Sequence, residues 1–115
     1  MTNPLATVAQ RWYRHCFQLV RAEGFYDQGV YKRLPPQLSW QRGNIQPASQ
    51  REIERLPEGT RSDGAVTVFT CAFMRTAAAP NQLADRIMYK GTEYEIGSAS
   101  YWESHNVYVC AKVGQ

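Results

Sequence analysis

The feature that most constrains the fold of this chain is a succession of short β-forming runs in its second half. These runs are rich in β-branched and aromatic residues and cover residues 65–71, 86–89, 92–96 and 107–113. In the last run Val109 faces one side and Tyr108 and Cys110 the other, which is the period of a strand. Lys90-Gly91 is a two-residue spacer that suits a tight hairpin, because glycine readily adopts positive φ. The sequence therefore predicts a mainly β fold, a small β-barrel or sandwich with long loops.

One short helix interrupts the β pattern. Ser49 and Glu52 have the spacing of a capping box, in which the serine hydroxyl accepts from the Glu52 amide and the carboxylate reaches back to the Ser49 amide. Apolar residues within this helix are only Ile53 and Leu56, and Pro57 ends it. We expect a surface helix at about 49–56.

The first residues of the chain allow two interpretations. Apolar residues between positions 3 and 22 fall at helical spacing, with Asn3-Pro4 as a start and Gly24 as a stop. Residues 15–21 also alternate as a strand does, and we expect a strand there. The expected organisation is an N-terminal arm or short helix at 1–14 and a single β-barrel domain over 15–115.

Glycine and proline mark the expected loops. Residues 22–36 contain two glycines and end in Pro35-Pro36, which predicts a loop, with a small ribbon within it as the alternative. Residues 37–46 are expected to be extended and to end at Pro47. An exposed loop is expected at 76–84.

Composition bounds the class of protein. The 115 residues suit one domain, and the net charge of +3 is too small to indicate nucleic-acid binding by itself. No apolar stretch is as long as a membrane-spanning helix requires. The N-terminus lacks the basic start and apolar run that would predict a secretory signal. The three cysteines contain no CxxC pair, which favours a reducing, cytoplasmic place of assembly. Cys71 and Cys110 lie in apolar runs and are expected to be buried.

Signals for catalysis are weak. Glycine-rich phosphate loops and nucleophile motifs do not occur in the sequence. His15 and Cys16 are neighbours on an expected strand, so their side chains point to opposite faces and do not chelate one ion. His105 lies in a polar turn, and Glu93 and Glu95 share what we expect to be a solvated sheet face. We predict no enzyme, catalytic residue, cofactor or metal site.

Two groups of residues are candidates for contacts with other molecules. The arginines around the capped helix favour a salt-bridged surface first, a subunit interface second and phosphate contact third. An aromatic group that includes Trp40 suits either base stacking or packing. The candidate subunit or partner interface consists of Ser49, Arg51, Glu52, Arg55, Arg61, Phe25, Tyr26 and Tyr31.

The order of several segments is more specific than any one of them. Gly43–Gly59 contains a Gln-Pro-Ala-Ser-Gln-Arg-Glu turn, and Asp85–Ile96 reads Asp-Arg-Ile-Met-Tyr-Lys-Gly-Thr-Glu-Tyr-Glu-Ile. Together with 64–70, 101–102 and 108–113, this arrangement resembles the small head–tail joining proteins of tailed bacteriophages, also called head-closure or stopper proteins. Gln50 stands where that family usually has glycine. The resemblance covers roughly residues 37–114.

The resemblance implies a structural virion protein without catalysis. It implies a small β-barrel that assembles as a ring, of six or twelve copies, in the neck of the virion after synthesis in the host cytoplasm. The implied partners are the portal or adaptor protein, the tail terminator or tail tube protein, and packaged DNA bound non-specifically in the channel, with no membrane. Such a ring joins head to tail and retains the genome.

Two other functions remain open at this point. Small β-barrels recur in phage tails, so a tail or baseplate component is one alternative. The second alternative is an OB-like nucleic-acid-binding module, which would need a basic groove lined with aromatic side chains.

Overall fold

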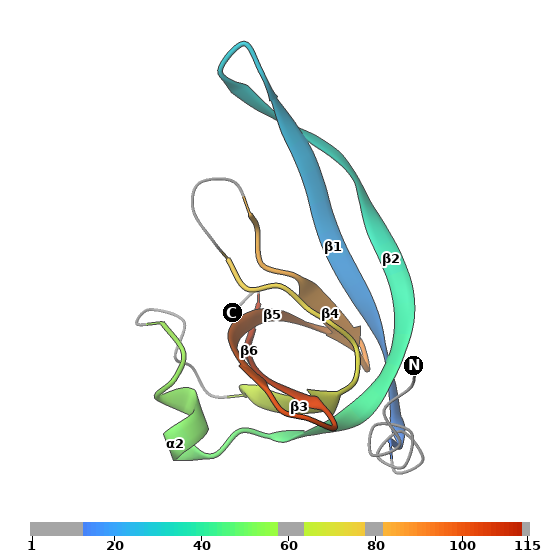
Figure 1. The fold of residues 1–115 in the computed structure, drawn as a ribbon, viewed down its shortest axis with the longest axis vertical. Helices are drawn as coiled ribbons and strands as arrows, with labels where there is room; N and C mark the ends of the chain where they lie inside the picture. The colour runs from blue at the N-terminus through green and yellow to red at the C-terminus, as the bar shows by residue number, and fades with distance from the viewer. Residues whose placement is uncertain (1–12, 58–63, 78–81, 114–115) are drawn as a thin grey trace.

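The protein is a closed, six-stranded antiparallel β-barrel with a long two-stranded ribbon projecting from it (Figure 1). The computed structural model describes residues 13–57, 64–77 and 82–113, with only the backbone of residues 25 and 26. The elements are β1 (His15–Asp27), β2 (Val30–Pro47), α2 (Gln50–Ile53), β3 (Val66–Thr70), β4 (Arg86–Tyr89), β5 (Thr92–Tyr101) and β6 (Asn106–Lys112). Around the barrel the order is β1-β2-β3-β6-β5-β4, and β4 pairs again with β1. The predicted mainly β barrel is therefore confirmed.

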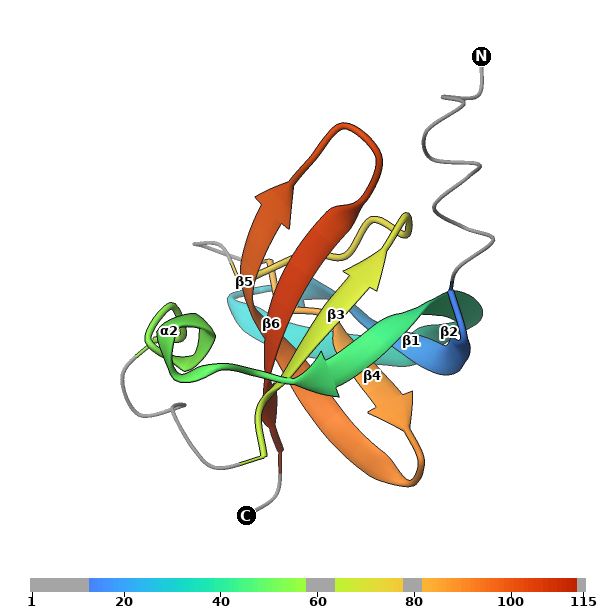
Figure 2. The same ribbon diagram turned by 90° about the horizontal axis from the view of Figure 1, so that it is seen from below.

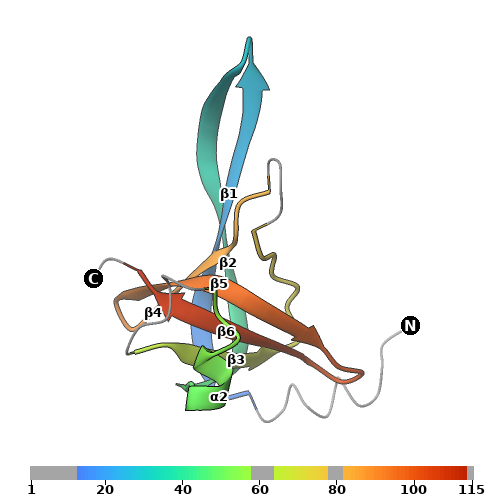
Figure 3. The ribbon, with the colours of Figure 1, turned by 90° about the vertical axis from the view of Figure 1, so that its left-hand side faces the viewer.

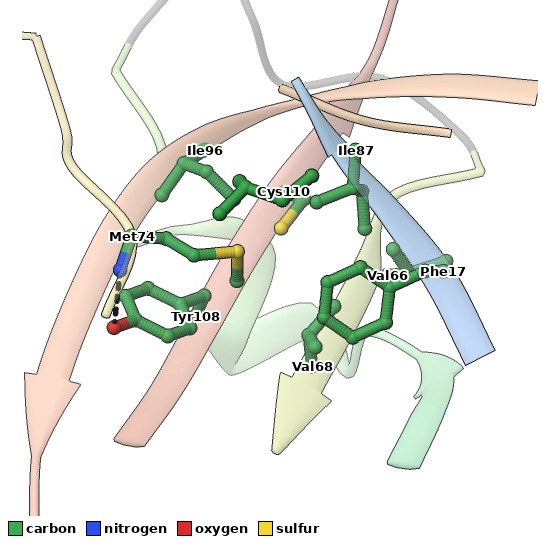
Figure 4. Packing of buried hydrophobic residues seen from close by; sticks show 9 residues of the cluster. Phe17, Val66, Val68, Met74, Ile87, Ile96, Tyr108 and Cys110 are labelled. Atoms are coloured by element: carbon green, nitrogen blue, oxygen red, sulfur yellow. Dashed lines mark hydrogen bonds between the residues drawn. The ribbon is translucent and has the colours of Figure 1, made fainter. Parts of the chain in front are cut away.

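The barrel interior is filled by alternate residues of each strand. Phe17 and Leu19 of β1, Val68 of β3 and Tyr108 and Cys110 of β6 belong to one buried cluster (Figure 4). Burial raises the pKa of the Cys110 thiol, so this side chain remains a neutral, apolar filler. The alternation predicted for the last strand is confirmed, because Val109 faces outward from the same strand.

Cys71 was expected to be buried like Cys110, and this prediction is wrong. Its side chain is only partly buried, and its sulfur lies 3.5 Å from both the Tyr13 hydroxyl and the Ser104 carbonyl oxygen. The apolar run 65–71 misleads here because the strand ends at Thr70, one residue earlier. Cys71 therefore begins the segment that leaves the barrel wall.

Residues 71–75 cross one end of the barrel and close it. Met74 is fully buried in the interior cluster. The Tyr108 hydroxyl accepts a hydrogen bond from the Met74 amide (2.9 Å) and donates one to the Ala72 carbonyl oxygen (3.0 Å) (Figure 4). Burial raises the pKa of this hydroxyl, which therefore keeps the proton that it donates.

The ribbon replaces the loop that the sequence predicted at 22–36. Beyond the barrel, β1 and β2 continue as paired strands to a two-residue turn, as Figures 1 and 3 show. Gln28 (φ 51°) and Gly29 (φ 81°) form that turn, and both angles are those of a tight hairpin. Gly24 lies inside β1, so its expected role as a stop signal is wrong.

Two local features let glycine and proline stay within these strands. The Tyr31 ring lies against Gly24, where any β-carbon would collide with it. The register slips between Arg21 and Glu23, where β2 has one extra residue, and Pro35-Pro36 occupy that irregular stretch. A bulge does not need every backbone N–H for pairing, so the prolines remain compatible with the ribbon.

The remaining sequence predictions concern the first strand, the Lys90-Gly91 hairpin, the end of β2, the N-terminal arm and the 76–84 loop. A strand from residue 15 is confirmed, and the helical interpretation fails for residues 15–22. The hairpin turn is confirmed by the positive φ of Lys90 (49°) and Gly91 (78°). The expected end of β2 at Pro47 is confirmed. Most of the expected N-terminal arm (1–12) and the middle of the expected 76–84 loop (78–81) lie outside the described residues.

Candidate functional site

The first candidate surface is the capped helix α2, which packs on the outer wall of the barrel (Figure 2). The Glu52 amide donates to the Ser49 hydroxyl (3.2 Å), and the Ser49 amide donates to the Glu52 carboxylate (2.9 Å). The predicted capping box is thus confirmed, although the helix itself ends at Ile53 rather than near Leu56. The two reciprocal hydrogen bonds fix where the chain leaves β2.

Leu56 anchors the turn after the helix. It is 1% exposed and packs in a second, outer cluster with Ala65, Val109 and Ala111. A β-carbon at Gly97 would collide with the Leu56 side chain, so the absence of a side chain at the β5 bulge creates the socket. The helix is therefore held against the barrel at a defined position.

Arg51 and Arg55 remain exposed on this helix and its following turn. Neither forms an ion pair with a carboxylate of the described residues. The salt-bridged surface that the sequence favoured is thus not seen among the described residues. Arg61, the third predicted member, lies outside the described residues.

Glu52 is held as a carboxylate. Partial burial is the largest single influence and raises its pKa, but the hydrogen bond from the Ser49 amide acts in the opposite direction. The hydroxyls of Thr67 and Ser49 and the positive charge of Arg55 add to the lowering, so the net pKa is below the usual glutamate value. The cap is therefore fully formed at neutral pH.

The second candidate surface is the ribbon. Of the predicted aromatic residues, Tyr31 lies against Gly24, and Phe25 and Tyr26 are paired through their backbones with Lys32 and Tyr31. Trp40, nearer the barrel, is 72% exposed. The structure thus separates the predicted interface residues into two places, the helix and the ribbon, and does not bring them together.

Sequence reasoning missed Asp85, the residue that sets the direction of the ribbon. Its carboxylate is fully buried and accepts hydrogen bonds from Arg21 Nε (3.1 Å), Arg21 Nη2 (2.9 Å) and the Arg75 amide (2.7 Å). The hydrogen bond to Asp85 raises the pKa of Arg21. Arg21 Nη2 also donates to the Phe73 carbonyl oxygen, which ties the ribbon base to the segment that closes the barrel.

Both histidine side chains have structural partners. His15 Nδ1 accepts from the Ile45 amide (2.9 Å), and its ring packs edge-on against Tyr89. His105 is hydrogen-bonded to the Ser104 hydroxyl. Within the described ranges no group of three or more His, Cys, Asp or Glu residues could hold a metal ion. The helices in those ranges are all too short or too polar to cross a membrane.

The segments that carry the family resemblance fall on consecutive elements of one barrel. Residues 43–59 include the end of β2 and α2, 64–70 contain β3, 85–96 contain the β4–β5 hairpin, and 108–113 contain most of β6. No protein-family model matches the chain, and comparison with curated proteins finds no significant match.

Proposed function

We propose that this chain is a structural protein of a tailed-bacteriophage virion. In this proposal it forms a ring between the portal complex and the tail, closes the filled head and retains the packaged DNA. The order of the resembling segments supports the proposal, because they fall in sequence on β2, α2, β3, β4, β5 and β6 of one barrel.

The observation that carries the proposal is the presence of two different exposed surfaces on one small barrel. A ring of identical subunits needs heterologous contacts, in which one surface of each subunit meets a different surface of the next. The capped helix offers Arg51 and Arg55, and the projecting ribbon offers Val30 and Leu34, which are 60% and 48% exposed. Figure 1 shows α2 and the ribbon tip far apart on the molecule.

The test is electron microscopy of particles made without this gene and then with a charge-reversed copy. We expect the knockout to give packaged or leaking heads beside separate, complete tails. The variant Arg51→Glu with Arg55→Glu should reproduce that defect, because it inverts the charge of the helix surface without touching Leu56 or the capping box.

The matched control is Lys90→Glu with Lys112→Glu, which makes the same change in net charge at other exposed positions. It should assemble normally. Heads with misshapen or baseplate-less tails in the knockout would place the protein in the tail, and normal infectious particles would overturn both structural functions.

A further inference from the structure

The two faces of the β1–β2 ribbon differ in how their charges are satisfied. Phe17 and Leu19 point into the core, so the odd-numbered residues of β1 define the inner face. Cross-strand partners lie on the same face, which puts Lys32 and Leu34 on that side as well. The even-numbered residues of β1 and their partners form the outer face.

Every charged side chain on the inner face has an ionic partner. Arg21 is bound by Asp85 at 2.9 Å, and Lys32 is bound by Asp27 at 3.0 Å. Glu23 lies 3.8 Å from Arg75. The charged side chains of the inner face are therefore all paired with opposite charges.

On β1 and β2 the outer face carries cations and no acid, whereas Glu93 and Glu95 lie on the same face of the neighbouring β4–β5 hairpin, opposite Met88 and Arg86. Arg33 and Arg42 of β2 lie on it, opposite Gly24 and Cys16, and both are exposed. Arg14 extends the row, because its amide donates to the outer-face side chain of Asn44. None of the three arginines forms an ion pair with a carboxylate of the described residues.

Exposed Trp40 lies between these cations. It pairs in register with Gln18, and Gln18 pairs with Met88 of β4, so the row continues onto a third strand. This outer row is defined as Arg14, Arg33, Trp40 and Arg42.

The described part of the molecule carries no unpaired acidic surface that would complement the basic outer row. Glu93 and Glu95, which share a hollow with Arg33, are held by Arg86 at 3.0 and 3.8 Å. Asp85 and Glu23 are engaged at the ribbon base, and Glu52 is engaged in the cap. A second copy of this chain therefore offers the outer row no unpaired acidic patch among those residues, whereas an external polyanion does.

We propose that the outer row binds the phosphate backbone of nucleic acid without reading its sequence. Arg33 and Arg42 are nine positions apart, which spans about 30 Å at roughly 3.3 Å per residue. A duplex of that length presents about eighteen phosphates, so several contacts form at once. With a single strand, Trp40 also supplies a flat surface on which an unpaired base stacks, whereas a duplex is held by the arginines alone. The proposed connector function supplies the identity of the ligand, packaged duplex DNA, but binding itself does not need a ring.

The test is fluorescence anisotropy of the full chain with a labelled 30-base-pair duplex and a labelled 30-nucleotide single strand. We expect affinity for the preferred form to fall steeply between 50 and 200 mM salt. The variant Arg14→Gln with Arg42→Gln should weaken binding at least about tenfold and reduce the log–log salt slope by about 1.8, because each lost phosphate contact removes about 0.9. A duplex preference identifies duplex DNA as the source of the phosphates, and a single-strand preference identifies unpaired strands.

The matched control is Arg51→Gln with Arg55→Gln, which removes the same charge from the helix surface. It should leave the salt slope unchanged. Equal loss in both variants would reduce the effect to net charge and overturn the proposal. Equal competition by polyglutamate would overturn it in favour of an acidic protein partner. DNA binding through this row together with normal necks in the knockout would leave the inference intact and reject the connector.

Discussion

β1 and β2 run through both the barrel and the ribbon, but the pairing and burial of their residues differ between the two regions. Within the barrel, β1 and β2 each pair on both edges and bury Phe17 and Leu19 in a closed core. Beyond it they pair chiefly with each other, and β2 exposes Val30, Leu34, Leu38 and Trp40. An isolated two-stranded ribbon is marginally stable in water, so its geometry depends on the barrel to which it is joined. The comparison separates residues kept for stability from residues available for contact.

Truncating one aromatic residue in each region gives the largest contrast. Phe17→Ala should lower the free energy of unfolding by about 3–5 kcal/mol, because it leaves a cavity among fully buried neighbours. Trp40→Ala should change it by no more than about 0.5 kcal/mol, because that side chain is largely in solvent already. Urea unfolding measures both, with Phe17→Leu as a milder substitute if the first variant does not fold. Equal destabilisation would mean that the ribbon is part of the core.

A pair of ion-pair variants tests the ribbon base against its tip. Asp85→Asn should cost about 2–4 kcal/mol, because it leaves the partly buried Arg21 without its carboxylate. Lys32→Gln breaks the exposed pair with Asp27 and should cost less than about 0.5 kcal/mol. Hydrogen exchange should show lost protection at residues 71–75 in the first variant only. A similar response to both changes would contradict the assignment of Asp85 as the anchor of the ribbon.

Loss of the helix cap should give a smaller effect than Phe17→Ala or Asp85→Asn, together with a pH signature. Ser49→Ala should destabilise the protein by about 1 kcal/mol through loss of the cap. The folded-state pKa of Glu52 is lowered, so its contribution is present above the usual glutamate pKa and is lost as the pH falls through the folded value. Glu52→Gln should therefore show a weaker loss of stability on acidification below about pH 4.5 than the wild type. Parallel acid profiles would show that Glu52 does not carry this dependence.

The barrel was largely predictable because its signals are local. Lys90-Gly91 specifies a tight turn, Ser49 and Glu52 specify a cap, and the alternation around Tyr108 specifies a strand with one buried face. Each of these features is complete within a few residues of sequence. The same holds for the exposure of Arg51 and Arg55, which follows from the short helix.

The ribbon and its anchor were not predictable for the opposite reason. Gly24, Gly29 and Pro35-Pro36 are signals of a loop, and they fit a ribbon only because Tyr31 covers Gly24 and a bulge holds the prolines. Asp85 has no local sign of burial, since its ligand Arg21 is 64 positions away. The charge difference between the ribbon faces likewise depends on register, which pairing alone determines.

The closure of the barrel through β1 and β4 has a consequence for the order in which the protein forms. The β1–β2 hairpin is local and closes on the scale of about 1–10 μs, whereas the β1–β4 contact joins segments far apart in the chain and must first overcome a larger loop-closure entropy. Both ribbon strands are synthesised before Asp85. We therefore expect the ribbon to form early and to acquire its fixed direction last, when Asp85 binds Arg21 and the barrel closes.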